Sequence, residues 1–140
     1  MNLNLNLNWT AIGVAFVVTL VISIFSGLYL PKHVVFISPL IGGLIAGYMV
    51  GGSYSNGIVN GGIAAGIAGL ISFPVIGLLS WSVVTTTLSN YGYHIPPETL
   101  LIGVVVGTAL VGLVTYFVLG LIGGIIGTAI KGRKNNQKMV

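Results

Sequence analysis

Apolar residues occupy four long stretches of the chain, separated by short polar or proline-containing segments. Each stretch is long enough to cross a bilayer, which takes about 17–25 apolar residues in a helix. The third and fourth are longer than the roughly 30 Å hydrocarbon core requires, so Pro74 is expected to kink the third and the fourth is expected to tilt or project. The pattern predicts an all-α integral membrane protein with a four-helix transmembrane domain over residues 9–130. The predicted helices cover about residues 9–30, 34–52, 58–88 and 98–130.

The two ends of the chain differ from these apolar stretches. Residues 1–8 alternate leucine and asparagine after the first methionine, and we expect a flexible or interfacial arm there. Residues 131–140 form a basic tail with four of the five lysines and arginines of the chain. Four spans place both termini on one side, and the positive-inside rule makes that side cytoplasmic in a multi-pass protein of the cell membrane. The tail is also expected to contact anionic lipid head groups.

Glycines recur at four-residue spacing within the apolar stretches. In a soluble helix each would cost about 0.5–1 kcal/mol relative to alanine, whereas in a membrane such GxxxG spacing lets two helix backbones approach closely. We therefore expect a glycine-packed bundle. A short polar turn joins the second and third helices, so their glycines should pack on each other, leaving the cluster in the fourth helix available for another subunit. The candidate packing residues are Gly43, Gly47, Gly51, Gly61, Gly62, Gly66, Gly69, Gly103, Gly107, Gly120, Gly124 and Gly127.

Composition removes several classes of function. Only 4% of the residues are charged and there is no cysteine, which excludes disulfides and thiolate metal sites. Glu98 is the only carboxylate, so paired-carboxylate catalysis within one chain and a Ser-His-Asp triad cannot be built. The basic residues follow an apolar run at the end of the chain, a position that favours a membrane anchor over nucleic-acid binding. We expect no enzyme activity and no cofactor.

One group of side chains could carry chemistry at the outer face. His33, His94 and Glu98 are all predicted at the outer face, and two histidines with one carboxylate could bind a divalent metal or transfer protons. The alternative is that all three are solvated loop residues, with Glu98 placed favourably at the start of the fourth helix.

Polar residues within the spans are restricted to hydroxyls and one amide. Asn60, Ser72, Thr115 and Tyr116 are the candidates. They could bond a neighbouring helix or their own backbone, or they could line a pore.

The glycine-rich hairpin also carries a family resemblance. GLIAGYMVGG at residues 43–52, a short polar turn, and GIVNGGIAAGIAG at residues 57–69 resemble a family of small archaeal four-helix membrane proteins of unknown function. The resemblance covers about residues 38–72 and, more loosely, the four-span layout. It implies a fold and an archaeal source but no activity and no site residues. We therefore predict a non-enzymatic structural or accessory subunit, with a small oligomeric channel-like or holin-like protein that passes ions or small solutes as the alternative.

The basic tail provides a test of the predicted topology. Replacing Lys131, Arg133, Lys134 and Lys138 by Gln should weaken the orientation bias, because the tail then no longer favours the cytoplasmic side. Protease accessibility in sealed membrane vesicles measures the fraction of chains in each orientation. An unchanged single topology would contradict the positive-inside assignment.

Overall fold

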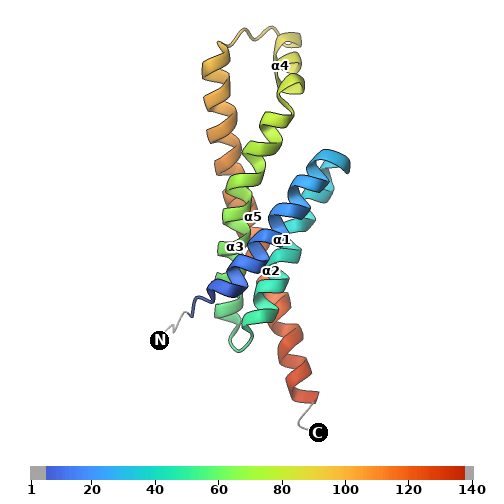
Figure 1. Cartoon of the computed structure of the whole chain (residues 1–140), viewed down its shortest axis with the longest axis vertical. Helices are drawn as coiled ribbons and strands as arrows, with labels where there is room; N and C mark the ends of the chain where they lie inside the picture. Colours follow the sequence, from blue (N-terminus) through green and yellow to red (C-terminus); the bar gives the residue numbers. More distant parts are fainter. Residues whose placement is uncertain (1–5, 138–140) are drawn as a thin grey trace.

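The computed structural model describes residues 6–137, which fold into five α-helices and one short 3-10 helix (Figure 1). Four helical segments are long and apolar enough to span a membrane, which confirms the predicted all-α, four-span fold class. Residues 1–5 of the predicted arm and Lys138 of the basic tail lie outside the described residues. The elements are α1 (Trp9–Tyr29), η1 (Lys32–Phe36), α2 (Ile37–Val50), α3 (Tyr54–Leu79), α4 (Trp81–Asn90) and α5 (Pro97–Gln137).

The turn between α2 and α3 follows directly from its sequence. Gly51 and Gly52 adopt positive φ angles of 60° and 73°, a region that side chains disfavour. Ser53 then caps α3, because its side chain accepts a hydrogen bond from the backbone N–H of Asn56 at 3.3 Å. The hairpin is therefore tighter than expected, and α3 begins at Tyr54.

The third predicted helix is divided in two. Pro74 lies inside α3 without ending it, as transmembrane helices tolerate. The break falls at Ser80, whose backbone leaves the helical region (φ −92°, ψ 15°) before α4 begins at Trp81. The fourth predicted helix, by contrast, is longer than expected. α5 continues through the predicted tail to Gln137.

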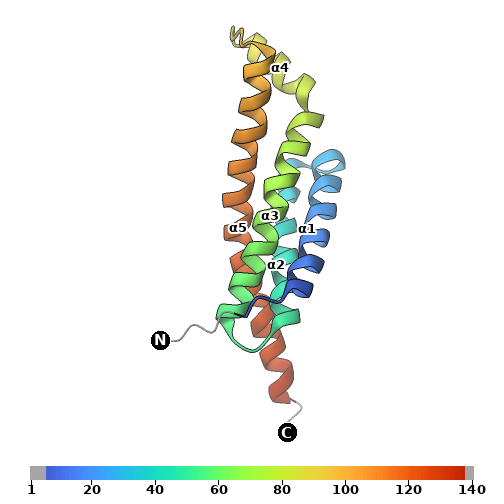
Figure 2. The same ribbon diagram turned by 60° about the vertical axis from the view of Figure 1, so that its left-hand side comes forward.

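The helices form a bundle with unequal ends. α1 begins and α5 ends at the same end, which we call the inner end (Figure 1). At the opposite, outer end, α4 and the adjoining part of α5 extend past the ends of α1 and α2 (Figures 1 and 2). We call residues 80–108 the outer arm.

Glycines bring α2 against α5. A Cβ atom built at Gly43 would meet the carbonyl oxygen of Gly120 closer than real Cβ atoms ever approach, and Gly47 stands in the same relation to Gly124. Two helices can reach this separation only where neither carries a side chain. The shared four-residue spacing fixes the parallel register of α2 on α5.

Glycines also bring α3 against α5. Gly61 packs on Gly120 and Gly124, and Gly69 packs on Gly112. The expectation that the glycines of the second and third helices mainly pack on each other, leaving the fourth for another subunit, is therefore wrong. The inner half of α5 carries glycines on a face wide enough to accept both helices at once.

The remaining candidate glycines have mixed surroundings. Three of them, Gly51, Gly62 and Gly66, face side chains of α5, and Gly127 on α5 lies against the Leu44 carbonyl of α2. Gly103 and Gly107 face open space, because a Cβ atom at either would meet no atom within 4 Å.

Helix α1 completes the bundle through other small residues. Ala15 on α1, Ala46 on α2 and Ala64 on α3 are fully buried together. Gly42 lets Thr19 approach the α2 backbone. The core therefore consists largely of backbone and methyl groups, and large apolar side chains point outward, as expected in lipid.

The contact between α2 and α5 generates a stability prediction. Gly47→Leu should lower the melting temperature of the purified protein, because the new side chain would separate two touching backbones, and overpacking typically costs about 1–3 kcal/mol. Gly13→Leu is the matched control, since Gly13 lies on α1 with no atom near its Cβ position. Equal melting temperatures for the two variants would contradict the glycine-packing account.

Candidate functional site

Hydroxyl groups meet in the interior, between α1, α2 and α5. Tyr116 is fully buried, and its Oη lies 3.0 Å from Ser23 Oγ, 3.1 Å from Ser38 Oγ and 3.0 Å from the Val35 carbonyl oxygen. Ser23 Oγ and Ser38 Oγ are 2.7 Å apart. We call Ser23, Ser38 and Tyr116 the hydroxyl cluster.

The cluster satisfies its own hydrogen-bonding groups. Three hydroxyl protons are shared among three hydroxyl oxygens and the carbonyl oxygens of Val35 and Thr19, the latter 2.6 Å from Ser23 Oγ. Buried polar groups that are satisfied in this way hold helices together in lipid. The cluster therefore connects three helices through hydrogen bonds within the protein. The sequence allowed two roles for Tyr116, bonding to a neighbouring helix or lining a pore, and its hydroxyl bonds to neighbouring helices.

The other three polar candidates have different surroundings. Asn60 is fully buried and holds the segment before α1: its Oδ1 accepts from the Asn8 backbone at 2.8 Å, and its Nδ2 donates to the Asn6 carbonyl at 3.0 Å. Ser72 is also fully buried, but its hydroxyl has no hydrogen-bond partner within residues 6–137. Thr115 is half-buried on α5.

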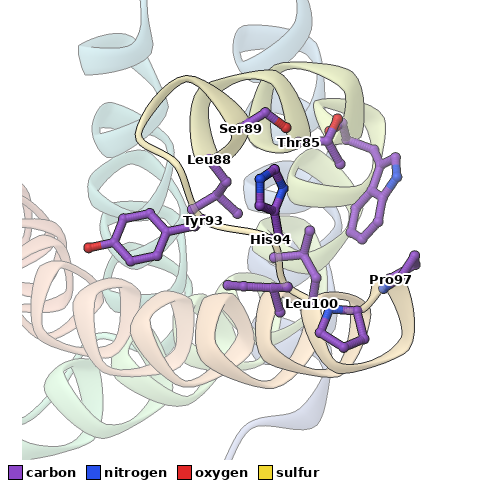
Figure 3. A pocket seen from close by; sticks show the side chains of 10 residues that line it. Thr85, Leu88, Ser89, Tyr93, His94, Pro97 and Leu100 are labelled. Atoms are coloured by element: carbon purple, nitrogen blue, oxygen red, sulfur yellow. The ribbon is translucent and has the colours of Figure 1, made fainter.

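A pocket of about 400 Å³ opens at the tip of the outer arm, which we call the loop pocket. It lies between α4, the connection at residues 91–96 and the start of α5. In Figure 3 the His94 ring points toward α4, near Leu88 and Ser89, whereas the ring of Tyr93 points away. Its lining residues are Trp81, Thr85, Leu88, Ser89, Tyr93, His94, Ile95, Pro96, Pro97 and Leu100.

The polar groups of the loop pocket can all donate hydrogen bonds: the Trp81 indole only donates, while the Ser89 hydroxyl and the neutral His94 imidazole both donate and accept. The Trp81 indole, the Ser89 hydroxyl and the His94 imidazole line the pocket, and no carboxylate is among the lining side chains. The hydroxyl of Thr85 donates to the Trp81 carbonyl at 3.1 Å, which directs its proton back to its own helix. The pocket can therefore receive a polar group that accepts hydrogen bonds.

The three weak metal candidates are not brought together. His33 lies in η1 beside α1, His94 lies in the connection before α5, and Glu98 lies in the first turn of α5. Among the residues that the structure describes, no three histidine or carboxylate side chains gather as metal ligands. The reason is topological, because η1 joins the two shorter helices while the other two residues lie on the longer arm.

Sequence reasoning missed two members of the hydroxyl cluster, Ser23 and Ser38. A signal was available on α1, where Thr19, Ser23 and Ser26 share one helix face at spacings of four and three residues and all three are fully buried. A hydroxyl stripe in an otherwise apolar span indicates contact with a polar group of another helix.

Comparison with known proteins gives a family without an activity. The model of a family described as a family of unknown function (DUF5518) matches residues 9–130. No curated protein and no solved structure matches the chain. The match covers the predicted transmembrane domain, while the archaeal source stays a prediction.

The hydroxyl cluster generates a second stability prediction. Tyr116→Phe should destabilise the protein by about 0.5–2 kcal/mol, because it removes hydrogen bonds inside the bundle while keeping the ring. The edge-to-face contact of this ring with Phe73, at 5.1 Å, should survive the change. Tyr29→Phe is the control, since Tyr29 is 72% exposed. Thermal unfolding in detergent measures the difference, and equal stability of the two variants would show that the cluster does not hold the helices together.

Proposed function

The chain belongs to the DUF5518 family, whose function is unknown, and we propose that it is a non-enzymatic accessory subunit of a larger membrane assembly. In this role the glycine-packed inner half is a rigid base. The outer arm is the part that contacts a partner protein.

The observation that carries this proposal is the unequal length of the helices. α1 has 21 residues and α5 has 41, so at 1.5 Å per residue they are about 30 Å and 60 Å long. The hydrocarbon core is only about 30 Å thick, and a bilayer that matches α1 leaves most of the outer arm beyond the core.

The projecting arm carries apolar side chains. Val83 on α4 is 59% exposed and Ile102 on α5 is 65% exposed. Outside the hydrocarbon such exposed side chains are disfavoured in water, and their burial against another surface would be favourable. Contact with another protein at the membrane surface would cover them.

The charge of the arm indicates what kind of surface it would fit. Residues 80–108 contain Glu98 as their only carboxylate and contain no lysine or arginine. Attraction between opposite charges therefore contributes little, and the partner surface should be apolar with a few hydrogen-bonding groups.

The inner end supports the orientation in our proposal. Lys131 donates to the Met49 carbonyl at 2.9 Å, which ties the basic end of α5 to the last turn of α2. Arg133 is exposed beside it. We propose that this end faces the cytoplasm of the cell membrane, where anionic lipid head groups would meet the basic residues.

A channel is the alternative that the sequence left open. Within one bundle, Gly120 and Gly124 of α5 touch the backbones of both α2 and α3 in the inner half, which leaves no room for a path between α5 and these two helices. A path for ions would then have to run between several copies of the chain, which makes the channel depend on homo-oligomerisation.

Site-specific crosslinking in native membranes tests the accessory role. A photoactivatable side chain at Val83 or Ile102 should give a discrete crosslinked product with another protein. The matched controls are Val17 and Val21 on α1, which are 54% and 59% exposed and should meet only lipid. Gel mobility and mass spectrometry of the products measure the difference.

Two results would overturn the accessory role. The first is that photoactivatable side chains in the outer arm give no more crosslinked protein than those on α1. The second is ion flux into liposomes containing only the purified chain, together with a homo-oligomer in native mass spectrometry, which would establish the channel instead.

A further inference from the structure

A second cavity adjoins the loop pocket along α5. This second cavity, of about 400 Å³, follows one side of the outer half of α5, and we call it the glycine groove. Ile95 and Leu100 line both cavities, so the two adjoin, and we refer to the pair as the depression. The groove is lined by Ile95, Thr99, Leu100, Gly103, Val104, Gly107 and Thr108.

The chemistry of this depression changes along its length. The loop pocket offers the Trp81 indole, the Ser89 hydroxyl and the His94 imidazole. The groove is lined mainly by aliphatic side chains and glycine, and the Thr108 hydroxyl at its far end donates to the Val104 carbonyl of its own helix. One end is therefore polar and the other is apolar.

The groove is open because two side chains are missing. Gly103 and Gly107 have no atom within 4 Å of their Cβ positions, unlike Gly43 or Gly120, which touch another backbone. Glycine destabilises a helix by roughly 0.5–1 kcal/mol relative to alanine, and here no helix contact within the chain offsets that cost. What the two glycines provide is space for something outside the chain.

The depression is also oriented like a membrane lipid. The groove lies where α5 passes Gly77 near the outer end of α3, since Val104 is 3.1 Å from the Cβ position of Gly77. The loop pocket lies farther out, where Trp81 begins α4, and tryptophan is typical of the membrane–water interface. The polar end thus faces the head-group region and the apolar end runs toward the hydrocarbon.

From this geometry we infer that the outer arm binds one phospholipid, with its phosphate in the loop pocket and one acyl chain in the glycine groove. Phosphate oxygens accept hydrogen bonds, and the pocket presents donors from Trp81, Ser89 and His94 without a carboxylate among its lining side chains. A hydrocarbon chain is the component of an amphiphile that suits a groove with an aliphatic lining and open space at Gly103 and Gly107. This site goes beyond the accessory role and does not depend on it.

Tryptophan fluorescence reports on binding directly. The chain contains two tryptophans, Trp9 at the inner end and Trp81 in the loop pocket, so Trp9→Phe leaves Trp81 as the only emitter. The probe is a single-chain phosphoglycerol lipid with a spin label near its head group, added to the protein in detergent micelles. We expect saturable quenching of Trp81 and one retained lipid per chain in native mass spectrometry.

Filling the groove should abolish binding. Gly103→Leu with Gly107→Leu places side chains in open space, and we expect at least a tenfold loss of retained lipid with an unchanged melting temperature. Gly13→Leu is the matched control, because it also adds a side chain in open space, but on α1. It should retain the lipid.

A second variant tests the loop pocket, where the head group would bind. It still tests the inference if the groove variant does not fold. His94→Ala with Ser89→Ala should remove the preference for the phosphoglycerol lipid over a monoacylglycerol of equal chain length. We expect that preference to be at least tenfold in the unaltered protein.

Three outcomes would overturn the inference. The first is that the groove variant retains as much lipid as the Gly13→Leu control. The second is that the unaltered protein binds the monoacylglycerol as tightly as the phosphoglycerol lipid. The third is that the groove variant changes its oligomeric state while it still retains lipid. The last would assign Gly103 and Gly107 to a contact between copies. Because these measurements use the purified chain, their failure leaves the crosslinking result for the accessory role intact.

Discussion

The direct contact of the α5 backbone with the backbones of α2 and α3 is the constraint on which the rest of the structure depends. In lipid there is no hydrophobic force to drive helices together, so close packing and hydrogen bonds must do so. Gly120 and Gly124 meet α2 and α3 at the same level of the bundle. One helix therefore sets the register of two others, and a side chain at either position would disturb both contacts.

The hydroxyl cluster lies farther out along the same helix and has a different role. Glycine contacts fix how close the helices lie, whereas the hydrogen bonds of Tyr116 with Ser23 and the Val35 carbonyl fix how α1 and η1 are placed on α5. Beyond this level α1 and α2 end, and only α3, α4 and α5 continue. The cluster is therefore near the boundary between a closed base and an open arm, and the loop pocket and glycine groove occur on the open side.

The sequence predicted the spanning helices, which the bilayer requires, but little about which helices pack against one another. Four long apolar stretches had to become spanning helices, because lipid leaves few alternatives for the backbone. The spacing of Gly43 and Gly47 indicated a close contact but not its partner, since α3 and α5 carry similar glycines. The break at Ser80 was missed because Pro74 gave the stronger local signal. His33 and His94 each precede a predicted helix, yet His33 lies in η1 between α1 and α2 while His94 lies in the connection between α4 and α5.

The central position of α5 also has a consequence for the order in which the chain is made. Among the four spanning segments, α5 leaves the ribosome last, and until then the contacts of Gly43 with Gly120, of Gly47 with Gly124 and of Gly61 with both cannot form. The earlier helices must wait in the membrane with their small-residue faces turned to lipid or to the insertion machinery. The contacts with α5 thus form in a single late step, so premature termination before α5 leaves only the contacts among α1, α2 and α3, such as those of Ala15, Ala46 and Ala64.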